Sequence, residues 1–181
     1  MRTLTISILG LAATLAAGCS ASSDNTLRGN VGGLSFSADH AFFDIATHST
    51  LDASVTVTEL RFFSYDGCAF YQNPAMKVAA PSFEIAIGLD STAPPAGSHV
   101  DRTTTTPGEF AIGSSGLARP ANGLWLVGGA HDQYAGSFTG GTISLAKVTA
   151  TTIEGDLEIT SPNGDYAVGS FAVAHCAAAD W

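Results

Sequence analysis

Segments that alternate apolar and polar residues with a period of two constrain the fold of this chain more than any other feature. In residues 153–159, Ile153, Leu157 and Ile159 alternate with acidic side chains, and residues 83–89 have the same period. Successive side chains of a β-strand point to opposite faces of its sheet. Both segments therefore predict strands with one face in a core and the other face in water.

Turn-forming residues separate segments of this kind along the chain. Asn163-Gly164 predicts a hairpin between residues 153–159 and a return strand over residues 166–175. In residues 55–63 the apolar positions change parity, which predicts a bulge or a strand that crosses between two sheets. Further strands are predicted at residues 34–37, 41–46, 110–112, 124–127 and 142–148.

The pattern of the chain favours strands almost throughout. We find no convincing amphipathic helix, and only residues 71–80 suit a short helical turn. Many short strands separated by turns are typical of an all-β fold. We therefore predict a single antiparallel β-sandwich or flattened barrel of about eight to ten strands.

The first residues have the pattern of an export signal. Arg2 gives a positive start, and residues 4–17 form an apolar stretch. This stretch is too short to span a hydrocarbon core of roughly 30 Å, which needs about 20 residues. It therefore predicts a signal peptide that directs the chain out of the cytoplasm.

The segment Leu15-Ala16-Ala17-Gly18-Cys19 resembles the lipobox of bacterial lipoproteins, although Ala16 stands where leucine is commonest. The resemblance implies cleavage after Gly18 and a diacylglyceryl thioether on Cys19, whose acyl chains would anchor the protein in a membrane. Ser20, in place of an aspartate, implies the outer membrane or the cell surface as the location within the cell envelope. An ordinary secretory signal followed by a chance cysteine is the alternative.

Glycine-and-strand patterns recur at residues 141–148, 153–159 and 168–176. They are similar to the C-terminal half of small uncharacterised bacterial lipoproteins with β-sandwich-like domains. This resemblance implies the architecture of the domain, and it implies no activity. The chain then divides into a lipoprotein signal peptide (1–18), a lipidated tether (19–27) and a β-sandwich domain (28–181).

The charge of the mature chain limits its partners. The signal peptide holds one of the seven basic residues and none of the 16 acidic ones, so the mature chain is one unit more negative than the −9 of the whole sequence. A negative field of this size disfavours binding to nucleic acid and electrostatic docking to anionic lipid. We therefore expect the lipid on Cys19 to be the attachment to the membrane, and the protein or small-molecule partner stays open.

With Cys19 taken by lipid, Cys68 and Cys176 remain, and two cysteines in an exported protein most simply form one disulfide. They stand 108 positions apart (176 − 68). Closing a loop of this size stabilises a fold by roughly 4–5 kcal/mol in the chain-entropy model. Two free or metal-binding thiols are the alternative, although the sequence has no Cys-x-x-Cys pair that would favour a zinc site.

Motifs for catalysis and metal binding are weak in this sequence. Gly113-Ser114-Ser115-Gly116 lacks the spacing of a nucleophile elbow. No two histidines form a paired metal-binding motif, so we predict no metal site and no cofactor, although His131 and Asp132 could meet another histidine in space. The five histidines are His40, His48, His99, His131 and His175.

Acidic and aromatic residues each allow two interpretations. Glu154, Asp156 and Glu158 share one face of a predicted strand, where they are either paired carboxylates for glycoside hydrolysis or, more simply, a solvated face. Aromatic residues could line a ligand groove, although a sandwich of this size needs most of them in its core. The best candidates for exposure are Tyr65, Tyr71 and Tyr134.

The export signal, the β-rich domain and the lack of a catalytic motif together predict a membrane-anchored, non-enzymatic interaction or envelope-structural module. A small ligand-binding module, for a carbohydrate or a hydrophobic molecule, is the alternative. A hydrolase is a third possibility, and it would need two carboxylates, or a histidine and a carboxylate, that meet only in the folded protein.

Overall fold

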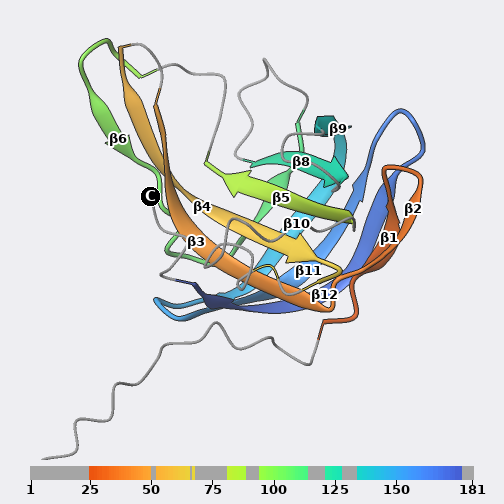
Figure 1. Cartoon of the computed structure of the whole chain (residues 1–181). Helices are drawn as coiled ribbons and strands as arrows, with labels where there is room; N and C mark the ends of the chain where they lie inside the picture. Colours follow the sequence, from red (N-terminus) through yellow and green to blue (C-terminus); the bar gives the residue numbers. More distant parts are fainter. Residues whose placement is uncertain are drawn as a thin grey trace, which may run out of the picture.

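A single curled β-sheet makes up the described part of the protein (Figure 1). The computed structural model describes residues 25–49, 52–65, 67, 81–88, 94–113, 121–127 and 134–176. The strands are β1 (Arg28–Val31), β2 (Leu34–Ser37), β3 (His40–Ser49), β4 (Ser54–Phe63), β5 (Pro81–Ile87), β6 (His99–Asp101), β7 (Gly108–Ala111), β8 (Ala121–Val127), β9 (Tyr134–Phe138), β10 (Gly140–Val148), β11 (Thr152–Thr160) and β12 (Tyr166–His175).

The sheet has 12 strands, and its main order is β7-β10-β11-β12-β3-β4-β5-β8-β9. Off this path, β1 pairs with β12 and β2, and β6 pairs with β4. The sheet curls into a half-barrel. The all-β prediction is therefore confirmed.

The expectation of a purely antiparallel sheet is wrong in two places, because β12 pairs with β3, and β4 with β6, in the parallel sense. The first parallel pair follows from the strand order. The β1–β2 hairpin lies beside the first half of β12, with β1 antiparallel to β12 and β2 antiparallel to β1. Strand β3 follows β2 closely in the chain and meets the end of β12, where it runs in the same direction as β12.

Two predicted strands, at residues 34–37 and 166–175, coincide with β2 and β12, and the other predicted strands overlap an observed one. The prediction missed β1, β6 and β9, which have 4, 3 and 5 residues. Strands this short scarcely complete one apolar–polar alternation, so periodicity does not reveal them. The helical turn suggested at residues 71–80 lies outside the described residues.

The bulge predicted in residues 55–63 is absent from the β3–β4 ladder, which pairs Ser54–Phe63 with β3 in unbroken register. The parity of the apolar residues changes because both faces of β4 are buried. Val55 and Val57 pack on the outer face of the half-barrel, whereas Leu60 and Phe62 pack on the inner face. The register shift found in β10 lies instead between Leu145 and Lys147.

The main core fills the inner face of the curled sheet. Phe83 lies at its centre, with its ring centroid 5.1 Å from that of Phe36, 4.8 Å from that of Phe62 and 5.4 Å from that of Phe138. Phe62 also meets Phe171 of β12 edge to face. Because these rings come from opposite parts of the strand order, they join the two sides of the half-barrel.

The chain joins the sheet before β1 begins. Thr26 donates its N–H to the Ser170 carbonyl oxygen at 3.0 Å, and Ala172 donates its N–H to Asn25 Oδ1 at 2.9 Å. Leu27 is completely buried in the main core. Residues 25–27, which the sequence places in the tether, thus form a strap along β12.

We expect Phe83→Ala to lower the free energy of unfolding by about 3–5 kcal/mol, because it leaves a cavity at the centre of the aromatic core. Urea unfolding followed by circular dichroism measures the change. Leu34→Ala is the matched control, since Leu34 is 44% exposed and its loss should stay within about 0.5 kcal/mol. Equal losses for the two variants would contradict the central position of Phe83.

Candidate functional site

Five charged or titratable side chains gather on the outer face of β3, β4 and β5. Strand pairing places them there, since Asp44 lies opposite Glu59 and Arg61 lies opposite Glu84 in the register. His48 stands four residues after Asp44 and points to the same face of β3. We call these five residues, Asp44, His48, Glu59, Arg61 and Glu84, the Arg61 cluster.

Arg61 is the centre of the cluster and binds one carboxylate on each of the three strands. Its Nε donates to Asp44 Oδ1 at 3.0 Å, its Nη1 donates to Glu84 Oε2 and its Nη2 donates to Glu59 Oε2. The second oxygen of Glu59, Oε1, lies 2.5 Å from His48 Nε2. The guanidinium therefore ties β3, β4 and β5 together through their side chains, in addition to the main-chain ladder.

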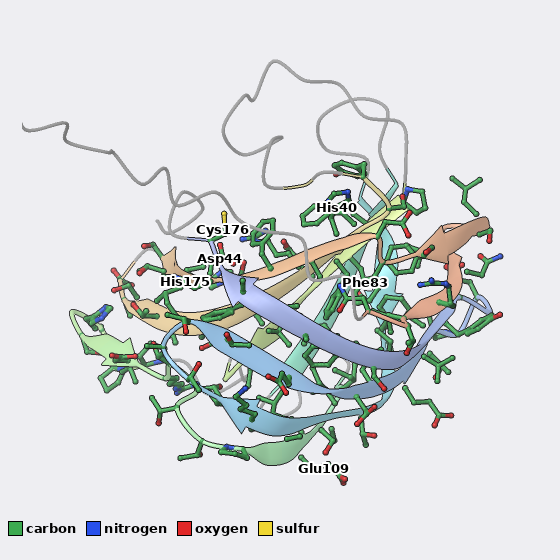
Figure 2. All side chains as sticks on the ribbon, turned by 90° about the horizontal axis from the view of Figure 1, so that it is seen from below. His40, Asp44, Phe83, Glu109, His175 and Cys176 are labelled. Atoms are coloured by element: carbon green, nitrogen blue, oxygen red, sulfur yellow. The ribbon has the colours of Figure 1, made fainter. Side chains whose placement is uncertain are left out.

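The cluster is buried at its centre and open at its rim. The side chains of Asp44, Glu59 and Arg61 are 0%, 3% and 9% exposed, whereas those of Glu84 and His48 are 23% and 40% exposed. Cys176 follows the parallel pairing of β12 with β3, and its N–H donates to the Phe43 carbonyl oxygen at 2.8 Å, in the residue before Asp44 (Figure 2).

Burial and the neighbouring charges move the pKa values of the cluster in different directions. Burial raises the pKa of Asp44 to about 6, and it also raises the pKa of Glu84. Burial acts the same way on Glu59, but the hydrogen bond from His48 and the charge of Arg61 outweigh it and lower the Glu59 pKa. The hydrogen bond to Glu59 raises the pKa of His48.

The cluster contains the residue types that a hydrolase would need, a histidine bound to a carboxylate and carboxylates that converge. However, both oxygens of Glu59 are already engaged, one by His48 and the other by Arg61. A carboxylate held in this way orients its partners and fixes the strands. The geometry therefore describes a network that holds three strands in register.

The sequence missed this cluster because its members come from three strands. Arg61 is separated from Asp44 by 17 positions and from Glu84 by 23. A signal was nevertheless present, since Glu59 and Arg61 occupy alternating positions of one strongly apolar predicted strand, and Asp44 and Glu84 interrupt two others. A buried strand does not normally carry such charges unless they are paired.

The acidic residues that the sequence singled out lie on the outer face of β11, and Asp156 and Glu158 are exposed. Glu154 accepts from Lys147 Nζ at 2.5 Å, and Asp156 Oδ1 accepts from Ser170 Oγ at 2.6 Å. The structure does not bring these acids to the Arg61 cluster. They form the solvated face of an amphipathic strand, which is the simpler of the two interpretations.

The other predicted site residues lie apart from the cluster or outside the described residues. Tyr65 is half-buried and packs against Phe63, with the two ring centroids 5.2 Å apart. His99 Nδ1 lies 2.9 Å from Ser54 Oγ at the end of β4, and the ring of His175 stacks on that of Phe43. The predicted residues outside the described ranges are Cys19, Cys68, Tyr71, Ser114, Ser115, His131 and Asp132; of Tyr134 only the backbone is described.

Two further findings hold for the described residues. No three histidine, cysteine, aspartate or glutamate side chains among them are grouped so that they could hold a metal ion. No helix among them has the length and hydropathy needed to cross a membrane.

We expect Arg61→Met to lower the free energy of unfolding at pH 7 by about 3–5 kcal/mol, because it leaves the buried carboxyl groups of Asp44 and Glu59, and that of Glu84 at the rim, without their cation. The loss should shrink as the pH falls towards 5, since the three carboxyl groups can then take up protons. Urea unfolding at both pH values measures it. Lys147→Met, which breaks the exposed pair with Glu154, is the control and should cost about 1 kcal/mol or less.

Comparisons with known proteins identify no relative of this chain. Protein-family models, curated proteins and solved structures were all compared with the chain, and none of them matches it. The function is therefore inferred from the residues and their geometry.

Proposed function

We propose that this protein is an exported lipoprotein, anchored through Cys19, that serves as a non-enzymatic interaction or structural module at the cell envelope. The observation that carries the proposal is the strap of residues 25–27 on β12. The strap begins six positions after the cysteine that resembles a lipid acceptor. Lipid and folded domain are therefore close neighbours in the chain.

The short connection limits how far the domain can stand from the membrane. Six steps along the chain separate Cys19 from Asn25. At roughly 3.3–3.6 Å per residue they reach at most about 20 Å. A domain held at this distance meets partners that belong to the envelope itself, which suits an interaction or structural role.

The place of attachment also suits an anchored module. The strap runs along β12, which pairs with β11, β1 and β3. Force on the lipid would therefore enter the sheet at an interior strand. Unzipping an edge strand breaks its hydrogen bonds one at a time, whereas an interior strand is held on both sides.

The acidic face of β11 lies across β12 from the strap, since Asp156 pairs with Ser170 and Glu154 with Ala172. Negative side chains at this place would repel anionic headgroups. This supports attachment through lipid alone, with the domain standing off the membrane surface. Arg61 and its three carboxylates hold strands together. This supports a structural role for the residues of the described sheet that most resemble catalytic groups.

A disulfide between Cys68 and Cys176 is part of the proposal. Cys176 is completely buried, packs with Phe42 and Phe63, and is not a free thiol, since none of the described cysteines is free. Cys68 lies outside the described residues, so the pairing stays a prediction. The bond would fasten the end of β12 to the segment that follows β4.

For the anchor, we expect intact-mass spectrometry of the membrane-extracted protein to give the mass of residues 19–181 plus the acyl chains on Cys19. Cys19→Ser should abolish the added mass and move the protein from the membrane fraction to the soluble fraction. Ser20→Ala keeps the acceptor cysteine and is the control. Wild-type protein that is soluble and carries no acyl chains would overturn the anchor.

For the disulfide, we expect two thiols to react with an alkylating agent in unfolded protein after reduction and none before it. Cys68→Ser with Cys176→Ser should lower the free energy of unfolding by roughly 4–5 kcal/mol, which is the loop-closure contribution. Urea unfolding of the oxidised and reduced wild type provides the same comparison without mutation. Two thiols that react without reductant would contradict the bond.

A further inference from the structure

We infer that the Arg61 cluster is a binding site for two protons, one on Asp44 and one on His48, and that it is electroneutral only when both protons are bound. The site is independent of the lipid anchor, so it stands whether or not Cys19 is acylated. Its ligand is the hydronium ion of the surrounding water, which reaches it through the partly exposed side chains of His48 and Glu84.

The charges of the cluster balance only when two protons are bound. Asp44, Glu59 and Glu84 bring three negative charges when ionised, and Arg61 brings one positive charge. With a neutral His48, the cluster would hold an excess of two negative charges around Asp44, Glu59 and Arg61, which are almost completely buried. Uncompensated charge in such a place costs several kcal/mol, so the cluster takes up protons instead.

The geometry points to the two side chains that carry the protons. Asp44 Oδ1 accepts from Arg61, but Asp44 Oδ2 is buried and has no hydrogen-bond partner. An ionised carboxylate would leave negative charge on that buried oxygen, whereas a protonated one leaves it neutral. The second proton is bound by His48, because an imidazolium donates its Nε2–H to Glu59 Oε1, 2.5 Å away, more strongly than a neutral ring does.

The pKa directions agree with this assignment. The charged groups that act on Asp44 are Arg61 and Glu59 on β4 and Glu84 on β5, and the same three groups act on His48. The pKa of Asp44 is raised to about 6 and that of His48 is raised above its ordinary 6.5, while that of Glu59 is lowered. Glu84, whose pKa is also raised, competes for the same protons from the rim.

The sign of the effect on stability follows from these directions. A raised pKa in the folded state stabilises the fold at low pH, and that stabilisation is lost as the pH rises through the raised value. Asp44 loses its contribution as the pH rises through about 6, and His48 loses its contribution above 6.5. Glu59 acts in the opposite sense, since its contribution is lost as the pH falls below 4.5. The cluster therefore stabilises the sheet most in mildly acidic water.

The direct test is to follow the two protons by NMR in the protein as the cell produces it, with ¹³C in the aspartate carboxyl groups and ¹⁵N in the imidazoles. Asp44, assigned through the loss of its signal in Asp44→Asn, should titrate with a midpoint near 6. Between pH 4 and pH 8, the Asp44 titration alone should raise the unfolding equilibrium constant on the order of 100-fold. Asp44→Asn should remove that rise, while Asp156→Asn on the solvated face should keep it.

Coupling between the two protons is tested with Glu59→Gln, which removes one negative charge with little change in shape. The cluster then needs one proton fewer, so the midpoints of both Asp44 and His48 should move down. Glu84→Gln should lower the same two midpoints. Because Glu84 is less buried than Glu59, this variant tests the coupling if Glu59→Gln disturbs the fold. Glu154→Gln, in the exposed pair with Lys147, is the control and should change neither.

Two results would overturn the inference. The first is an Asp44 signal that titrates at or below the ordinary aspartate pKa of about 3.9. The second is that the midpoints of Asp44 and His48 stay unchanged in both Glu59→Gln and Glu84→Gln. Unchanged midpoints would mean that the two groups titrate independently of the charges around them.

Discussion

The junction between β12 and β3 is the contact on which the rest of the structure depends. It joins the two parts of the strand order through two parallel residue pairs, Ala174 with Phe42 and His175 with Phe43. So short a ladder supplies few main-chain hydrogen bonds, and the Cys176 N–H extends it by one more. Side-chain packing must therefore help to hold the two parts together. The contact of Phe62 with Phe171 joins them inside the half-barrel.

The two faces of the sheet are held by different kinds of interaction. The inner face is closed by apolar packing, which is non-directional and scales with the area removed from water. The outer face of β3, β4 and β5 carries the Arg61 cluster, whose charges balance only when protons are bound. A buried ion network of this kind contributes less to net stability than apolar residues of the same volume, but it accepts only one register of the three strands.

The strap and the junction connect the architecture to the proposed role. Residues 25–27 attach the chain to β12, so an anchor on Cys19 would act on the strand that also holds β11, β1 and β3. The acidic face of β11 lies across β12 from this attachment. A lipoprotein with this arrangement would stand close to the membrane without adhering to it electrostatically, and it would present the remainder of the half-barrel to the envelope.

Local sequence signals determined the β-class of the fold, strands β2 and β12, the Asn163-Gly164 turn and the solvated face of β11, because alternation and turn chemistry act within a few residues. Tertiary structure decided the parallel pairs, the burial of both faces of β4, the short strands β1, β6 and β9, and the Arg61 cluster. These features depend on which strands become neighbours, and that choice is made by the packing of distant residues such as Phe83 with Phe138. Asp44, Arg61 and Glu84 became a site only when three separate strands were placed side by side, since no spacing along the chain records that they meet.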